Sequence, residues 1–179
     1  MTDLTVRLAT PDDAPNWRAL RLDGIRENPS VFIVTAEEAA AVPMTEDIRR
    51  LSNGDRVMAF VRETPVGIAG FNRNAVPRAR HRAEIGPLYV APEARGRGIS
   101  DQLMATLMAA AHAAGVWQLE LFVNVENAPA IALYKRHGFA EAGKIPNAIH
   151  GAQGLEDDLM MIRTDKPDAE RASVRHFPT

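Results

Sequence analysis

The chain has 179 residues, of which 46% are apolar and 25% are charged, and its formal net charge at pH 7 is −2. This length and composition fit one globular domain, and the charge gives no general attraction to nucleic acid or to anionic membranes. The lack of cysteine excludes disulfides, thiolate metal sites and cysteine nucleophiles, and the first residues contain no apolar signal or membrane segment, so a cytoplasmic location is expected.

The N-terminal part of the chain predicts a strand followed by two helices. Residues 4–9 alternate apolar and polar side chains, which is typical of a half-buried strand. Thr10, before a proline and two aspartates, marks the start of a helix that should end near "ENPS" at residues 27–30. A second, short helix should begin at Thr45 and stop at "NGD", residues 53–55.

The middle of the chain predicts a hairpin and then a parallel crossover. Residues 56–63 and 66–73 are strand-like runs separated by "TP", which favours an antiparallel hairpin. A third strand-like run, residues 82–90, leads through a glycine-containing loop into an amphipathic helix that ends at Gly115, and residues 116–124 resemble a buried strand. A strand, a helix and a second strand in this order form a parallel crossover, so the sheet should be mixed.

The C-terminal part predicts one more helix and one more strand. Residues 127–138 have a proline in their first turn and a glycine at their end, as short helices do, and residues 159–163 are strand-like. We expect one α/β domain over residues 1–164. Residues 165–179 are polar and aperiodic, and we expect them to form a loosely ordered tail.

The loop "APEARGRGIS", residues 91–100, has the chemistry of a phosphate site. Gly96 and Gly98 let the backbone approach a ligand, and the free N–H groups and dipole of the following helix favour an anion. Arg95 and Arg97 add guanidinium groups suited to phosphate oxygens. A charged turn whose glycines only permit a tight bend is the alternative. The loop lacks the Lys-Ser or Lys-Thr of a Walker A motif and the last glycine of a dinucleotide fingerprint.

Two blocks of sequence resemble the signatures of the GCN5-related N-acetyltransferase (GNAT) superfamily. "LYVAPEARGRGIS" contains its Arg/Gln-x-x-Gly-x-Gly/Ala pattern, with Ser100 where the family prefers glycine or alanine, and "NAPAIALYKRHGF" contains its Asn-x-x-Ala-x-x-Leu-Tyr-x-x-x-Gly-Phe pattern. The blocks lie in family order, and the strong part of the resemblance covers residues 84–139. It implies an α/β fold with a mixed, mostly antiparallel sheet, flanking helices and a splayed parallel pair of strands at the cofactor site.

The resemblance implies that the cofactor is acetyl-CoA. Loop amides and the helix start would hold its pyrophosphate, the splayed strand around Tyr89 would pair with the pantetheine amides, and Asn127 would contact the pantetheine region. Pro87 supports an interrupted ladder in that strand, because proline has no N–H to donate. Asp101 would repel a phosphate unless it points away. The complete expected cofactor-binding set is Leu88, Tyr89, Val90, Arg95, Gly96, Arg97, Gly98, Ile99, Ser100, Asn127 and Tyr134.

Transfer of an acetyl group to an amine needs a base, because an alkyl amine is almost fully protonated at pH 7. Glu84 is the candidate, since its distance from Arg95 matches that of the catalytic glutamate in the histone-acetyltransferase branch of the superfamily. The role requires burial that raises the pKa of the carboxyl group, or a water relay. The alternative is a solvated strand residue, or one paired with Arg80 or Arg82, and His81 is the reserve base.

Tyr134 is the candidate general acid. A tyrosine stays protonated at neutral pH and can donate to a departing thiolate, and the family pattern places its tyrosine beside the sulfur. A core tyrosine with a satisfied hydroxyl is the alternative. The isolated histidines have no metal-ligand spacing, so we expect no metal.

These observations favour an N-acetyltransferase that moves an acetyl group to a primary amine, of a small molecule or a peptide, by direct attack in a ternary complex. A non-catalytic CoA-binding sensor of the same fold is the alternative, and nucleic-acid binding is disfavoured because the basic residues form no aromatic-interleaved surface. The acceptor site should lie in residues 20–44 and 144–158, where Phe32 offers packing and Glu37 and Glu38 offer attraction for a cation. The acceptor, the acyl-chain preference and any homodimer stay open.

Overall fold

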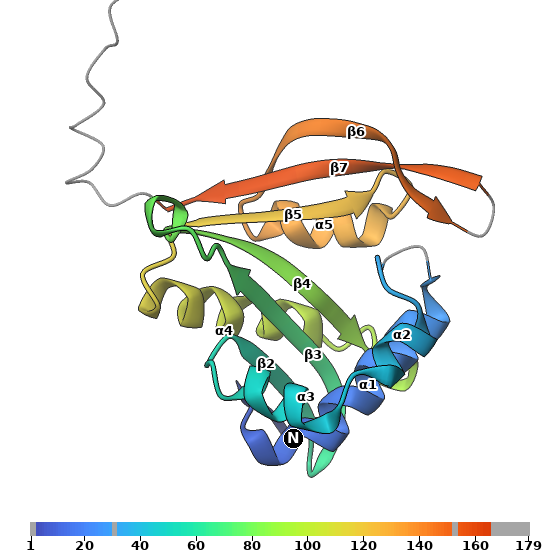
Figure 1. Cartoon of the computed structure of the whole chain (residues 1–179), viewed down its shortest axis with the longest axis vertical. Coiled ribbons are helices and arrows are strands. Elements are labelled where there is room, and N and C mark those ends of the chain that lie inside the picture. Colours follow the sequence, from blue (N-terminus) through green and yellow to red (C-terminus); the bar gives the residue numbers. More distant parts are fainter. Residues whose placement is uncertain (1–2, 30–31, 152–153, 166–179) are drawn as a thin grey trace, which may run out of the picture.

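The computed structural model describes residues 3–29, 32–151 and 154–165. Within these residues, seven strands form one sheet in the order β1-β2-β3-β4-β5-β7-β6 (Figure 1). The strands are β1 (Leu4–Leu8), β2 (Arg56–Val61), β3 (Thr64–Arg73), β4 (Arg82–Val90), β5 (Gln118–Asn124), β6 (Ala140–Gly151) and β7 (Gly154–Thr164). Neighbouring strands are antiparallel except for β4 and β5, which are parallel. The mixed, mostly antiparallel sheet predicted from the sequence is confirmed.

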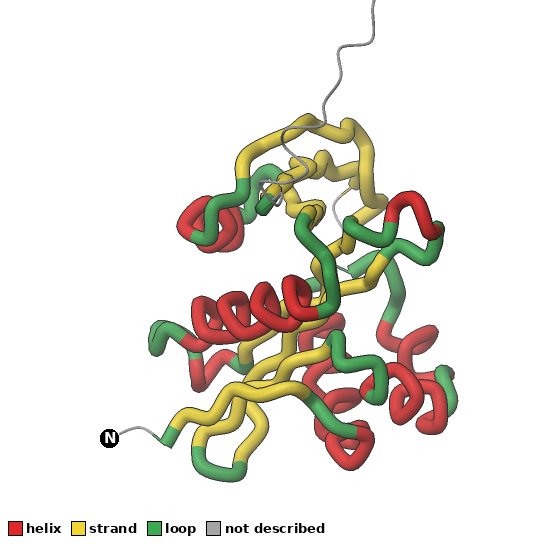
Figure 2. Tube along the Cα trace, turned by 90° about the vertical axis from the view of Figure 1, so that its left-hand side faces the viewer, coloured by secondary structure: helices red, strands yellow, loops and turns green. Residues whose placement is uncertain are grey.

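Helices cover both faces of this sheet. They are α1 (Ala14–Glu27), α2 (Ala36–Ala41), α3 (Met44–Leu51), α4 (Ile99–Ala113) and α5 (Ala128–Arg136), with short 3-10 turns η1 (Pro11–Asp13), η3 (Pro77–Ala79) and η4 (Pro92–Ala94). Helix α4 packs across β1 to β4 on one face, and α1 packs on β3 and β4 from the other, with α2 and α3 beside it (Figure 2).

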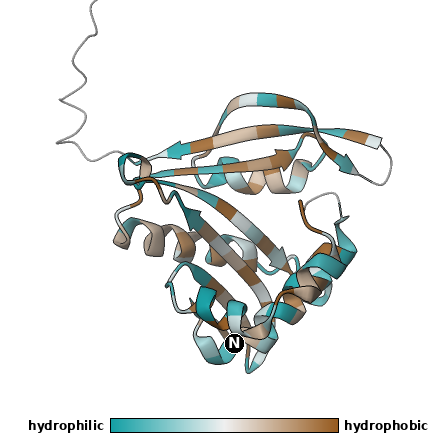
Figure 3. Ribbon diagram, viewed as in Figure 1, coloured by the Kyte–Doolittle hydropathy of each residue, from teal (hydrophilic) through white to brown (hydrophobic). Residues whose placement is uncertain are grey.

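Strand β2 shows why both faces are covered. Val57 and Ala59 belong to the core on the side of α4, whereas Met58 and Phe60 belong to the core that contains Trp17 of α1. Because successive side chains of a strand point to opposite faces, a run that is apolar at every position, as residues 57–61 are, must be buried on both faces. The central strands are accordingly apolar on the ribbon, and polar residues gather on the outer sides of the helices (Figure 3).

The hairpin turn lies two residues earlier than predicted. Strand β3 starts at Thr64, so the turn consists of Arg62 and Glu63, and the "TP" pair lies within the strand, where Pro65 stands opposite Phe60. The β2–β3 register is irregular between Ala59 and Phe60, and such irregularities accommodate a residue that has no N–H.

Helix α3 also differs from the prediction in its first turn. It begins at Met44, with Pro43 in the N-cap position, rather than after a cap at Thr45. The threonine therefore lies inside the first turn.

The sequence gives no clear sign of two elements that the structure contains. Helix α2 has no apolar period, and its start is fixed by a capping box in which Thr35 and Glu38 exchange backbone-to-side-chain hydrogen bonds of 2.8 and 3.1 Å. Strand β6 lies at the edge of the sheet and is exposed over most of its length, so it lacks the alternation that marks a half-buried strand. The predicted last strand, residues 159–163, is the second half of the longer β7.

Apart from Asp165, the predicted tail of residues 165–179 lies outside the described residues. The boundary between domain and tail at residue 164 stays a prediction.

Candidate active site

The parallel strands β4 and β5 separate after a short paired segment. Residues 82–84 of β4 pair with residues 118–120 of β5, and no pairing between these strands follows in the described residues. Strand β4 continues along β3 as far as Val90, while β5 continues along β7. One edge of residues 85–90 is therefore left without a neighbouring strand. The splayed parallel pair predicted from the family resemblance is confirmed.

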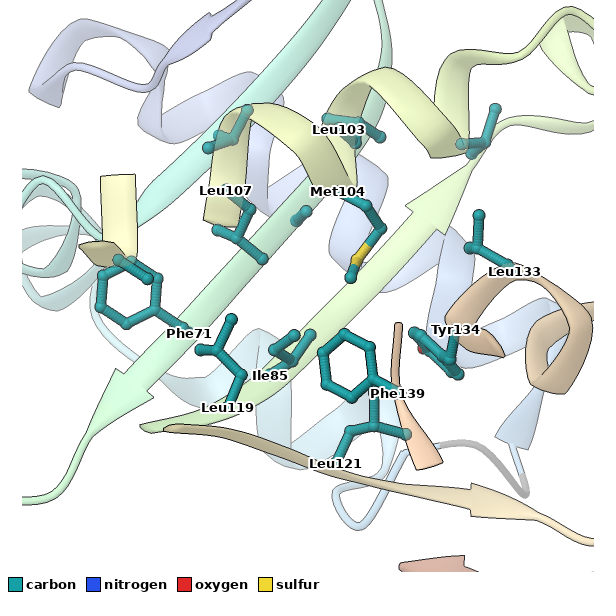
Figure 4. Packing of buried hydrophobic residues seen from close by; sticks show 14 of the residues in the cluster. Phe71, Ile85, Leu103, Met104, Leu107, Leu119, Leu121, Leu133, Tyr134 and Phe139 are labelled. Carbon is teal, nitrogen blue, oxygen red and sulfur yellow. The ribbon is translucent and has the colours of Figure 1, made fainter. Parts of the chain in front are cut away.

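Side chains of α4, α5 and β5 fill the space around this divergence. Met104 and Tyr134 lie near Ile85 and Phe139 beside the separating strands (Figure 4). On the other side of β4, the β3–β4 register shifts between Ala69 and Phe71, so that two residues of β4, one of them the proline at position 87, stand opposite a single residue of β3. This irregularity fits the interrupted ladder expected from that proline.

The loop from Arg95 to Ser100 turns sharply before α4. Gly96 and Gly98 adopt φ angles of 72° and 73°, and nothing lies within 4 Å of the point where a Cβ atom would sit on either residue. The left-handed conformation favours glycine, and the open space leaves room for a ligand against the backbone. Ile99 begins α4, whose first N–H groups have no acceptor inside the helix. The backbone thus has the form of an anion site.

The side chain of Arg95 contacts β4 and α1. Its Nε donates to the carbonyl oxygen of Val90 at 3.0 Å, and its guanidinium group forms an ion pair of 2.6 Å with Glu27 of α1. The Tyr89 hydroxyl donates to the same carboxylate at 3.0 Å, and the Arg95 guanidinium lies 5.8 Å from the Tyr89 ring centroid. These contacts join the loop, β4 and α1. A direct contact of Arg95 with phosphate stays a prediction, as does that of the exposed Arg97.

Asp101 points away from the loop amides toward α5. Its carboxylate accepts from Arg136 and lies 3.1 Å from each of Arg136 and the ring nitrogen of His137. Although partial burial acts to raise the pKa of Asp101, hydrogen bonds from these two residues lower it overall. The repulsion between Asp101 and a phosphate, which the sequence predicts unless the side chain points away, is therefore offset by two partners, Arg136 in the last turn of α5 and His137 at its C-cap.

Tyr134 lies on α5 next to the splayed strands. Its side chain is buried, and its ring meets that of Phe139 edge-on at 5.9 Å between centroids. Burial raises the pKa of Tyr134 to about 12. Asn127 caps the same helix, because its side-chain oxygen accepts from the backbone N–H of Ala130 at 3.2 Å. This cap gives Asn127 a structural contact, and its contact with a cofactor stays a prediction.

One large cavity brings the predicted catalytic residues together. It has a volume of about 1560 Å³ and lies against β4, α1 and the β6–β7 hairpin. Glu84, Leu88 and Tyr134 all line it. Glu84 is exposed on the cavity wall. It is therefore not the buried base that one form of the hypothesis required. Its position allows the other form, in which a water molecule relays the proton.

Arg82, a possible ion-pair partner of Glu84, and His81, the reserve base, do not line this cavity. Arg82 pairs with Glu120 of β5, at 2.8 Å, rather than with Glu84. His81 stacks on Trp117 with 4.2 Å between ring centroids and is not among the cavity-lining residues. Of the two candidates for the base, Glu84 lines the cavity and His81 does not.

The acceptor side of the cavity differs from the prediction. Phe32 lines it as expected, but Glu37 and Glu38 do not, because α2 turns them away and Glu38 is used in the capping box. The charged residues that sequence reasoning missed are arginines, among them Arg21 and Arg56. Their only sequence signal is an excess of arginine in α1 and around β2, which does not reveal that these residues face one cavity.

Comparison with known proteins places this geometry in a family. Residues 17–139 match the profile of the acetyltransferase (GNAT) family, which is more than half of the chain. The chain belongs to this family of acetyltransferases. The mycothiol acetyltransferases of Brachybacterium faecium and Clavibacter michiganensis are each 29% identical over 74% of this chain. Those matches cover 39% and 41% of the relatives, so this chain spans about two fifths of their length.

Solved structures agree with this assignment. The ribosomal-protein-alanine N-acetyltransferase of Brucella melitensis is 27% identical, with a TM-score of 0.75 over 89% of this chain and 99% of that one. A protein of Salmonella typhimurium, solved with its cofactor acetyl-CoA, has a TM-score of 0.81 over 99% of both chains at 16% identity, which is a likeness of fold. Acetyl-CoA is thus the cofactor seen with this fold.

Two further findings bear on the site. Among the described residues, no cluster of three or more histidine, aspartate or glutamate side chains is arranged to hold a metal ion. None of the helices in the described part of the chain is both long enough and apolar enough to cross a membrane.

The two tyrosines of the chain give a direct test of the burial at the site. Burial, with a hydrogen bond to Glu27, raises the pKa of Tyr89 to about 12, and burial alone raises that of Tyr134 to about 12. We therefore expect ultraviolet titration of the folded protein to show no tyrosinate until the pH is well above 10, whereas the denatured chain should titrate near 10.

The same shift has a consequence for stability. Because both folded-state pKa values exceed those of the unfolded chain, the stabilisation is complete below pH 10 and is lost as the pH rises toward 12. A Tyr134→Phe variant assigns the two titrations, and a folded-state tyrosine titrating near pH 10 would contradict the described packing.

Proposed function

We propose that the protein is an acetyl-CoA-dependent N-acetyltransferase that acts on a primary amine by direct attack in a ternary complex. The observation that carries this proposal is the free edge of β4, which lies at a cavity that Glu84 and Tyr134 also line. The names of the relatives all describe acetyltransferases and do not favour the alternative of a non-catalytic CoA-binding module. The names refer to different molecules, mycothiol and ribosomal-protein alanine, so they do not identify the acceptor of this chain.

The residues present fit acetyl-CoA. The edge of Leu88 to Val90 that faces away from β3 is suited to the amides of a pantetheine chain, with the Val90 carbonyl already accepting from Arg95. The open backbone of the loop at residues 96–100 is suited to a pyrophosphate. Asn127 and the Tyr134 hydroxyl lie on the helix that flanks the same strand. When bound, acetyl-CoA supplies an acetyl group activated as a thioester.

Acetyl transfer requires a base for the amine, a donor to the acyl oxygen and a donor to the departing sulfur, and this chain has a group for each. Glu84, acting through a water molecule, takes the proton of the acceptor ammonium before attack. A backbone N–H on the free edge of β4 donates to the acyl oxygen as negative charge develops there. The Tyr134 hydroxyl donates to the departing sulfur. No cysteine is present to carry an acyl group, so the amine attacks directly.

The burial of Tyr134 refines its role. Its pKa of about 12 lies above the pKa of an ordinary thiol, about 8.5. Complete proton transfer from tyrosine to the thiolate is therefore uphill. We infer that the hydroxyl acts mainly as a hydrogen-bond donor that stabilises the developing thiolate, and that solvent supplies the proton of the product thiol.

Replacement of Tyr134 by phenylalanine tests this role. The variant should lower kcat roughly tenfold to a hundredfold, as expected for the loss of one hydrogen bond to developing charge, while its dissociation constant for CoA changes little. Stopped-flow thiol release and titration calorimetry measure the two quantities, and a thermal melt checks folding. An unchanged kcat in folded Tyr134→Phe protein would remove the tyrosine from the mechanism.

Replacement of Glu84 by glutamine tests the base. The variant should lose activity at pH 7, and the loss should shrink as the pH approaches the pKa of the acceptor amine, because the free amine then needs no base. Glu63→Gln, in the exposed turn between β2 and β3, is the matched control and should keep the wild-type pH profile. Glu84→Gln activity that stays within twofold of wild type at pH 7 would rule out Glu84.

A further inference from the structure

Arginines dominate the charge of the cavity wall. Among the described residues that line the cavity, the basic side chains other than histidine are Arg21, Arg26, Arg49, Arg50, Arg56 and Arg73, and the acidic ones are Asp55, Glu84 and Asp158. Six arginines thus line the cavity beside three acidic residues, and two of the six, Arg26 and Arg49, are paired with Asp23 and Glu46, which do not line it. Arg21, Arg50 and Arg56, from α1, α3 and β2, act on one another electrostatically, and we call these three the arginine cluster.

Arg56 forms the buried base of the cluster. It donates to the backbone oxygens of Asp55 and Phe71 and, at 2.6 Å, to the side-chain oxygen of Asn72. Its side chain crosses the backbone of Gly70, where a Cβ atom would lie 2.7 Å from the Arg56 Cδ. Burial lowers the pKa of Arg56, while the Asp55 carboxylate, its ion-pair partner at 3.2 Å, acts to raise it and repulsion from the other two arginines acts to lower it. Its positive charge is therefore fixed in place at the cost of desolvation.

The guanidinium groups of Arg21 and Arg50 have fewer hydrogen-bond and ion-pair partners than that of Arg56. No carboxylate lies within ion-pairing distance of Arg21 among the described residues, and Asp47, the carboxylate that acts on it, is held by Arg18 at 2.5 Å. Arg50 shares one partner, Glu46, with Arg49. Burial lowers the pKa of Arg21, and the next largest cause is repulsion from Arg50. Two half-buried guanidinium groups thus lack a full complement of negative charge.

Like charges gathered in a partly buried wall destabilise one another unless an anion lies between them. Guanidinium groups bind carboxylate and phosphate oxygens through paired N–H donors. From this geometry we infer that the acceptor is an amine that also carries an oxyanion, a carboxylate or a phosphonate-type group, which Arg21 and Arg50 bind above Arg56. This inference rests on the proposed function and names its substrate class.

The sheet register places the two ends of such an acceptor near their partners. Arg56 is hydrogen-bonded to Asn72, and Asn72 stands directly opposite Glu84 in the β3–β4 ladder. Side chains at opposed positions of neighbouring strands are about 5 Å apart at Cβ. The path from Arg56 through Asn72 to Glu84 is therefore short. An acceptor with only a few bonds between its oxyanion and its amine, such as an amino acid, fits this spacing.

Four primary amines of equal length test the inference. β-Alanine, 2-aminoethylphosphonate, propylamine and ethylenediamine share an aminoethyl group and differ at the far end, which is a carboxylate, a phosphonate, a methyl or an amine. With acetyl-CoA, kcat/KM for one or both anionic amines should exceed that for propylamine by roughly tenfold or more, and ethylenediamine should be the poorest acceptor. The two anionic amines separate carboxylate from phosphonate recognition. Alanine and alaninamide repeat the comparison with the oxyanion one carbon closer to the amine.

Substitutions in the arginine cluster assign the preference to its residues. Arg21→Gln and Arg50→Gln should each reduce the ratio of kcat/KM for the anionic amine to that for propylamine roughly tenfold, and Arg21→Lys should keep most of it. Arg78→Gln is the matched control, because Arg78 is an exposed arginine of the η3 turn that does not line the cavity. It should leave the ratio unchanged. A thermal melt checks that each variant is folded.

The outcomes separate this inference from the proposed function. Transfer to propylamine or ethylenediamine as efficient as transfer to the anionic amines would overturn the anionic acceptor and leave the acetyltransferase intact. Calorimetry with CoA present gives a readout that needs no turnover: binding of an anionic amine weakened by Arg21→Gln supports the inference even if no acceptor reacts. Absence of such binding together with absence of transfer would overturn the anionic acceptor, whereas the proposed function would be contradicted if CoA itself failed to bind the folded protein.

Discussion

The separation of β4 from β5 is the constraint on which the rest of the site depends. If β4 and β5 stayed paired as far as Val90, the N–H and C=O groups on their facing edges would be hydrogen-bonded to each other. Instead, β5 turns to β7 and leaves residues 85–90 paired on one side only. Buried polar backbone groups must find partners, and an exposed strand edge is a template for another extended chain. A pantetheine arm with its amides is such a chain.

The charged residues around this edge mostly hold the framework. Arg95 joins the loop to Val90 and to Glu27, and Asp101 joins α4 to α5 through Arg136. Both residues lie where a phosphate is expected, and in both the side chain is committed to protein partners. The affinity of the loop for an anion would then come chiefly from its backbone N–H groups and the helix dipole. By contrast, on the acceptor side of the cavity Arg21 has no ion-pair partner among the described residues, and Arg50 shares Glu46 with Arg49.

The glycine loop before α4 and the helix α5 could be predicted from sequence because their signals are local. The glycines at 96 and 98 and the tyrosine at 134 lie within short blocks whose spacing is set by one loop and one helix. Strand β6 could not be predicted, because an exposed edge strand carries no apolar alternation, and α2 could not because its signal is a capping box rather than a period. The acceptor side was also predicted with the wrong sign of charge. Its arginines come from α1, α3 and β2, and only the tertiary fold brings them together.

Amide hydrogen exchange with and without CoA tests most directly whether the free edge of β4 receives the cofactor. At saturating CoA, exchange should slow at those residues of 85–90 whose N–H groups face away from β3, because these groups acquire acceptors. Residues 121–123 of β5, which pair with β7, should change little. Binding of CoA that leaves exchange along residues 85–90 unchanged would contradict the account.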